Sequence, residues 1–137
     1  MRQENVAVTV DNVVLCKLEN QFKVLLIKRK SDPFKGQWAL PGGFIEEDED
    51  LATAAKRELQ EETGVKVENV EQVRAFGKPG RDPRGRMISV AFLSRIFCEE
   101  ELNHGDDADD AQWFSINHLP ELAFDHDEII KAAQDLL

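Results

Sequence analysis

Three glutamates, Glu58, Glu61 and Glu62, lie close together in the stretch RELQEETG, where the surrounding pattern predicts a helix. Residues three and four apart share one face of a helix. At about 100° per residue, Glu61 lies about 60° to one side of Glu58 and Glu62 about 40° to the other. The three carboxylates therefore share one sector. They repel one another at the helix end whose dipole also disfavours anions.

Such a cluster is either a solvated face, with Arg57 and Glu61 as a helical ion pair, or a site for a cation. The Gly-Gly turn of LPGGF, just before the helix, favours the cation because glycine lets the backbone approach a ligand closely. Hard oxygen ligands with no thiol or imidazole nearby select Mg²⁺ or Mn²⁺ over zinc. Since Mg²⁺ typically bridges carboxylates to substrate phosphates, the expected chemistry is hydrolysis or transfer at a phosphate.

The elements that would position these acids alternate between strands and helices. Asp48 or Asp50 is suited to begin the acidic helix, and Gly64 to end it in the left-handed conformation. The predicted strands are 5–20, 22–29, 65–77, 87–97 and 111–115, the predicted helices 50–63 and 127–137, and the predicted loops 30–43 and 78–86. This order predicts one α/β domain over residues 1–137, with helices covering a sheet.

Charge and cysteine content limit the classes of partner. A net charge of -10 argues against binding to duplex nucleic acid or to an anionic membrane, because both need basic surface. No stretch has the pattern of a signal peptide or the length of a membrane span. Cys16 and Cys98 have neither metal-ligand spacing nor a disulfide pattern, so we expect buried thiols in a reducing, cytoplasmic compartment.

The acidic helix also carries a family signature. From Gly43 the chain reads Gly, five residues, Glu49, seven residues and then RELQEETGV, which resembles the Nudix box at every fixed position. The pattern spans 23 residues at fixed spacing, and its lead-in GQWALPGG is also typical of these proteins. The resemblance implies a Nudix fold, an α/β/α sandwich around a mixed β-sheet. It also implies hydrolysis of a nucleoside diphosphate linked to another moiety.

Carried over onto this sequence, the resemblance makes Glu58, Glu61 and Glu62 the ligands of a divalent metal, Mg²⁺ or Mn²⁺. The carbonyl of Gly42 is a further expected ligand. Arg57, with Glu49, is expected to hold the loop and helix in position. Glu58 could be a metal ligand or the base that accepts a proton.

A second resemblance covers nearly the whole chain. The segments FGKPGRDPRGRMISVAFL and AQWFSINHLPELAFDHDEII look like those of bacterial and archaeal ADP-ribose pyrophosphatases. It implies that ADP-ribose is split into AMP and ribose 5-phosphate. The cationic loop after residue 76 is expected to face the substrate, because guanidinium groups bind phosphates well. The substrate-binding candidates are Phe76, Pro79, Arg81, Arg84 and Arg86; Phe76 could instead be a core residue and Arg86 structural.

Several alternatives stay open from the sequence. The substrate could be another nucleoside diphosphate derivative: an oxidised nucleoside triphosphate, a dinucleoside polyphosphate or NADH. The chain could also be an ADP-ribose-sensing domain without activity. The proton acceptor could be Glu58 or an acid within residues 99–107. The histidines do not cluster in sequence and are expected to be structural or exposed. A homodimer is expected by analogy with related pyrophosphatases.

Overall fold

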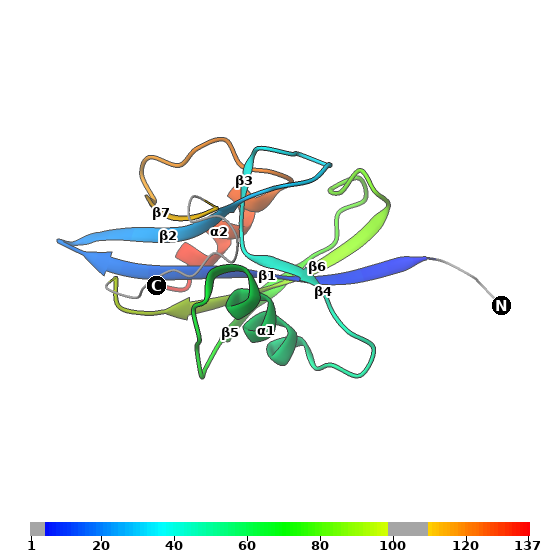
Figure 1. Ribbon diagram of the computed structural model, residues 1–137, viewed down its shortest axis with the longest axis horizontal. Helices are drawn as coiled ribbons and strands as arrows, with labels where there is room; N and C mark the ends of the chain where they lie inside the picture. The colour runs from blue at the N-terminus through cyan, green and yellow to red at the C-terminus, as the bar shows by residue number, and fades with distance from the viewer. Residues whose placement is uncertain (1–4, 99–109) are drawn as a thin grey trace.

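A mixed β-sheet with one helix on each face forms the fold (Figure 1). The computed structural model describes residues 5–98 and 110–137. The strands are β1 (Val6–Leu18), β2 (Gln21–Lys28), β3 (Trp38–Ala39), β4 (Gly42–Phe44), β5 (Glu71–Phe76), β6 (Arg86–Arg95) and β7 (Ala111–Ser115), and the helices are α1 (Leu51–Thr63) and α2 (His126–Gln134). The sheet order is β3-β2-β1-β6-β5, with β4 also paired to β1 and β7 to β2.

The central strand β1 is apolar on both faces, and its alternation separates the two helices. Val10 packs in a cluster with Ala54 and Ala55 of α1, whereas Val13 packs with Ile129 of α2. Successive side chains of a strand point to opposite faces of the sheet. The predicted α/β fold with helices covering the sheet is therefore confirmed, and residues at odd positions of β1 share the face of α2.

The first two predicted strands form a hairpin. β1 and β2 pair antiparallel, with Leu18 opposite Gln21. The connecting residues Glu19 and Asn20 both have positive φ angles, 53° and 65°. Positive φ at both central residues is the requirement of the two-residue turns that suit the twist of a hairpin.

Two sequence predictions were wrong in extent. The segment 30–43 was predicted to be loop but contains β3 and the start of β4, both too short to show an alternating pattern. The strand predicted over 65–77 is confined to Glu71–Phe76, with an irregular register between Gln72 and Arg74. The acidic helix matches its prediction: Asp50 precedes it, and Gly64 ends it with a φ of 79°.

The two cysteines form a disulfide, so the prediction of free thiols was wrong. Cys16 and Cys98 are 82 residues apart in sequence, but their Cα atoms lie 5.1 Å apart. The cause is the parallel pairing of β1 with β6, which places Leu15 opposite Arg95. Cys16, the next residue of β1, and Cys98, just beyond the end of β6, therefore meet, and sequence spacing alone does not show this contact.

No helix in the described part of the chain is long and apolar enough to cross a membrane.

Candidate functional site

A cleft of about 210 Å³ opens where β1, β4, the end of α1 and the start of α2 meet. It is lined by charged and aromatic side chains together with the Gly-Gly turn that precedes α1. The lining residues are Thr9, Asp11, Ile27, Arg29, Leu40, Gly42, Gly43, Phe44, Glu62, Arg81, Asp82, Arg84, Phe124 and His126.

Glu62 connects the acidic helix to the Gly-Gly turn. Its Oε1 accepts a hydrogen bond of 2.7 Å from the backbone N–H of Gly42. Burial raises the pKa of Glu62 to about 8, and the nearby carboxylates Glu58 and Asp11 add to that rise. The structure thus brings together the two predicted ligand residues Gly42 and Glu62.

Asn12 fixes the turn against the helix. Its side-chain amide donates to the carbonyls of Pro41, at 3.2 Å, and of Ala55, at 3.0 Å. Its backbone N–H also donates to Pro41. Because Asn12 is almost fully buried in β1, these bonds hold β1, the turn and α1 in one arrangement.

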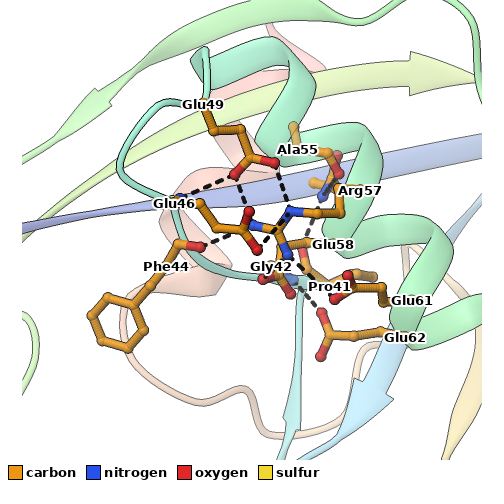
Figure 2. A network of polar contacts seen from close by, with 11 residues as sticks. Pro41, Gly42, Phe44, Glu46, Glu49, Ala55, Arg57, Glu58, Glu61 and Glu62 are labelled. Carbon is orange, nitrogen blue, oxygen red and sulfur yellow. Dashed lines mark hydrogen bonds and ion pairs between the residues drawn. The ribbon is translucent and has the colours of Figure 1, made fainter.

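Arg57 is the cation at the centre of the acidic helix, as Figure 2 shows. Its guanidinium donates to both carboxylate oxygens of Glu49, at 2.6 and 2.8 Å. It also donates to Glu58 at 2.9 Å, to Glu61 at 3.3 Å and to the carbonyl of Phe44 at 3.2 Å. The Arg57 hydrogen bond lowers the pKa of Glu49. Arg57 therefore links the loop before α1 to the helix, as the sequence predicted.

The two remaining predicted ligands differ in exposure. The Glu58 side chain is 15% exposed and that of Glu61 58%. Burial raises the pKa of Glu58 although Arg57 opposes the rise. The carboxylates of Glu58 and Glu61 both accept hydrogen bonds from Arg57. Among residues 5–98 and 110–137, no group of three His, Cys, Asp or Glu side chains converges as a metal site.

Two of the three predicted substrate-binding arginines lie in the cleft, but each is paired with a carboxylate. Arg81 donates twice to Asp125, at 2.9 and 2.6 Å, and its side chain is only 4% exposed. Arg84 donates twice to Asp82, at 3.1 and 2.8 Å. Arg81 thus links the cationic loop to the residue before α2, and the charges of both arginines are balanced within the protein.

The other predicted substrate contacts lie elsewhere. Pro79 and Arg86 are exposed and do not line the cleft. Phe76 is 5% exposed and belongs to the core cluster with Ile129 and Leu93. Of the two alternatives for Phe76, the structure therefore favours the core residue over a partner for a base. Glu58, one candidate for the base that accepts the proton, lies in the described part of α1. The other candidates, the acids from Glu99 to Asp107, lie outside the described residues.

Arg29 is a cleft residue that the sequence analysis missed. Its Nε donates to the carbonyl of Pro33 at 2.7 Å, and its guanidinium lies 5.0 Å from the centre of the Phe124 ring. In the part of the chain that the structure describes, no carboxylate bonds to it. Burial and then the positive charge of Arg84 lower the pKa of Arg29. The available signal was an arginine at the end of an apolar strand, within the basic run KRK.

Asp11 and His126 form the floor of the cleft and were also missed. Ser89 Oγ donates a hydrogen bond to Asp11 Oδ2, and His126 Nε2 lies 3.5 Å from Asp11 Oδ1. His126 Nδ1 accepts from the N–H of Leu40 at 3.0 Å, so the proton of the neutral ring is on Nε2. The signal for Asp11 was an acid inside the apolar run VAVTVDNVVL.

His126 predicts a pH dependence of stability. His126 is 4% exposed, and burial lowers its pKa below the usual value of 6.5. The carboxylates of Asp11 and Asp125 act to raise this pKa, whereas the positive charges of Arg81 and Arg29 lower it further. The unfolded chain then binds more protons below about pH 6.5. The contribution of His126 to the free energy of unfolding is therefore fully present above that pH and is lost as the pH falls. The slope is at most about 1.4 kcal/mol per pH unit.

Urea unfolding at pH 7.5 and 5.5 checks this expectation. The native chain should lose more unfolding free energy between the two values than His126→Asn, which keeps an acceptor for Leu40 but does not titrate in this range. An equal loss in both proteins would contradict a buried neutral His126.

Comparison with known proteins agrees with this geometry. The NUDIX domain family matches residues 8–133. The chain is 47% identical to the ADP-ribose pyrophosphatase of Methanocaldococcus jannaschii over 91% of its own length and 71% of that protein's. It superposes on the NUDIX domain of Shewanella oneidensis NrtR complexed with ADP ribose with a TM-score of 0.86 and 34% identity, covering 98% of this chain and 90% of that one.

A second similar structure contains a metal. It is a bifunctional NMN adenylyltransferase/ADP ribose pyrophosphatase from Francisella tularensis complexed with AMP and a manganese ion. The TM-score is 0.78 at 33% identity, and the match covers 99% of this chain but only 43% of that protein. The family match over most of the sequence, together with the observed fold and box helix, shows that this chain belongs to the Nudix hydrolase family.

Proposed function

We propose that this protein is a divalent-metal-dependent hydrolase that splits ADP-ribose into AMP and ribose 5-phosphate. The observation that carries the proposal is the cleft itself, where Glu62 of the box and Gly42, the residue before the box, lie together with Arg29. An acid that can bind a metal and a guanidinium that can bind a phosphate thus share one small space. The 47% identity with an archaeal ADP-ribose pyrophosphatase supports the choice of substrate.

The residues present fit Mg²⁺ or Mn²⁺. Glu58, Glu61, Glu62 and the carbonyl of Gly42 offer only hard oxygen atoms, which these ions prefer over sulfur or nitrogen. Glu58 and Glu62 are largely buried, so a dication would offset the cost of ionising them. When bound, the metal would neutralise phosphate charge and lower the pKa of a coordinated water.

The remaining roles fall to residues that grip and orient the substrate. Arg29 can give a phosphate two parallel N–H donors without breaking a bond to a carboxylate, which Arg81 and Arg84 cannot. Arg81, held by Asp125, keeps the cationic loop against the cleft. Arg57 keeps the carboxylates of Glu58 and Glu61 near the turn. Glu58 or an acid of residues 99–107 is proposed to accept the proton of the attacking water.

A substrate panel tests the proposal. The native protein with Mg²⁺ is incubated with ADP-ribose, NADH, a dinucleoside polyphosphate and an oxidised nucleoside triphosphate, and the products are separated by chromatography. We expect the largest kcat/KM for ADP-ribose, with AMP and ribose 5-phosphate in equal amounts. A larger kcat/KM for one of the other substrates would reject ADP-ribose as the preferred one.

A second function, binding of ADP-ribose without hydrolysis, is favoured by the similarity to the NrtR domain complexed with ADP ribose. The complete set of box acids favours catalysis. Saturable binding of ADP-ribose in the presence of Mg²⁺ or Mn²⁺, with no AMP released, would establish the binding domain instead.

Arg57→Lys is expected to lower the rate of hydrolysis about 10–100-fold, the usual effect of losing a partner of metal ligands. Lysine carries a single ammonium and cannot bond both oxygens of Glu49 while reaching Glu58 and the carbonyl of Phe44. Steady-state kinetics with Mn²⁺ titration measures the change. Lys56→Arg, one residue away, is the control and should keep the native rate. Native kinetics in Arg57→Lys would contradict the positioning role.

A further inference from the structure

Two phenylalanine rings at the mouth of the cleft share one guanidinium. The Cζ atom of Arg84 lies 5.3 Å from the centre of the Phe44 ring and 5.6 Å from that of Phe124. Both distances are within the range of a cation–π contact. We propose that Phe44 and Phe124 form the slot that binds the adenine base, and that Arg84 covers this slot when no nucleotide is bound. The inference rests on the proposed function and assigns one end of the substrate.

Phe124 has a backbone conformation that points to a function. Its φ is 54°, in the left-handed region that residues with a large side chain rarely adopt. Such outliers persist where the surrounding structure enforces them, and they gather at ligand sites. Here the ring packs edge-on against Phe34 with centroids 4.7 Å apart and lies 5.2 Å from the ring of His126. These two contacts hold the ring of Phe124 in the wall of the cleft.

Phe44 supplies an accessible ring. It is 46% exposed, two residues after Gly42, and it lines the cleft. Figure 2 shows its side chain directed away from the carboxylate network around Arg57. A phenylalanine ring exposed beside the cleft offers an aromatic face on which a planar ligand can stack.

Arg84 is the more exposed of the two cleft arginines that pair with a carboxylate. Its side chain is 37% exposed, and its carboxylate partner Asp82 is two residues away in the same loop. A cleft of about 210 Å³ is also smaller than the roughly 300–1,000 Å³ of ordinary small-molecule sites. A nucleotide therefore needs more room than the cleft offers, and moving Arg84 provides it between the two rings.

The chemistry of the slot selects the base and not the terminal ribose. A purine has two π-faces, which stack on aromatic side chains or on a guanidinium plane. A ribose has hydroxyl groups and no π-face. Aromatic rings stack on any nucleobase. The slot can therefore bind adenine without hydrogen bonds to the edge of the base.

The two products of the proposed reaction separate the slot from the rest of the cleft. Inhibition constants of AMP, which carries the base, and of ribose 5-phosphate, which does not, are measured for the native protein, Phe44→Leu and Phe124→Leu. We expect the constant for AMP to rise about tenfold in each variant, which corresponds to the loss of one stacking contact. The constant for ribose 5-phosphate should stay within twofold.

Phe97→Leu is the matched control, because Phe97 is 80% exposed and does not line the cleft. It should leave both constants unchanged. If Phe124→Leu fails to fold, Phe44→Leu alone carries the test, since its side chain is exposed. Equal changes for the two products, or no change for AMP, would overturn the slot. If the native protein does not hydrolyse ADP-ribose, calorimetric titration measures the dissociation constants of AMP and ribose 5-phosphate in the same variants. A failure of the proposed activity can thus be told apart from a failure of the proposed slot.

Discussion

Glu62→Gln is expected to reduce the turnover of ADP-ribose more than a hundredfold while the fold stays intact. Losing an indirect partner of a metal ligand typically costs about 10–100-fold, and losing a buried ligand should cost more. Glutamine keeps the shape of the side chain and an oxygen that can accept the hydrogen bond from Gly42, which in the native protein is 2.7 Å long. It cannot supply a negative charge to a metal. Activity and stability are therefore expected to separate.

The measurement is kcat at saturating Mg²⁺ and again at saturating Mn²⁺, with the thermal midpoint recorded on the same samples. Glu68→Gln, an exposed change outside the cleft, is the control and should behave as the native protein. A near-native rate for Glu62→Gln at high metal concentration would remove Glu62 from the ligand set.

Gly42→Ala is expected to destabilise the folded state by several kcal/mol, at or above the upper end of the usual cost of overpacking, about 1–3 kcal/mol. A Cβ atom at Gly42 would lie 2.1 Å from the carbonyl oxygen of Val10 and 2.7 Å from Asp11 Oδ1. The first contact is with backbone of the central strand, where Asp11 pairs with Gly42. That backbone cannot move without breaking the pairing of β1 with β4.

Two other glycines show whether the contact or the conformation causes the loss. At Gly43 a Cβ atom would lie 2.8 Å from the end of the Glu58 side chain, which can rotate away, so Gly43→Ala should lower activity more than stability. At Gly80 the φ is +84° and nothing lies within 4 Å, so Gly80→Ala should cost only about 1–2 kcal/mol of backbone strain. Chemical unfolding of the three variants should give the largest loss for Gly42→Ala, and similar losses in all three would contradict the backbone contact.

The sequence predicted the architecture and the box helix because those depend on local signals. Runs of β-branched and aliphatic residues predicted the first two strands, and Gly64 marked the end of the helix. The helical spacing predicted that Glu58 and Glu62 share a sector, and Glu62 does reach the turn at Gly42.

The rest of the site depends on contacts between distant segments. Arg81 meets Asp125 and Asp11 meets His126 because β1, the cationic loop and α2 converge on one cleft. The arginine loop was predicted as substrate-facing from its charge. Charge alone does not show that Arg81 and Arg84 are already paired, nor that Arg29 is not. The disulfide followed from the parallel register of β1 and β6, which sequence spacing does not encode.

The claim on which the account depends is that the acids of α1 hold a divalent ion beside the diphosphate. Titration of the purified protein with Mn²⁺, followed by calorimetry with and without AMP, measures this directly. We expect saturable binding that tightens when AMP is present and is lost in Glu62→Gln. Absence of Mn²⁺ and Mg²⁺ binding in both conditions, or binding that Glu62→Gln leaves unchanged, would contradict it.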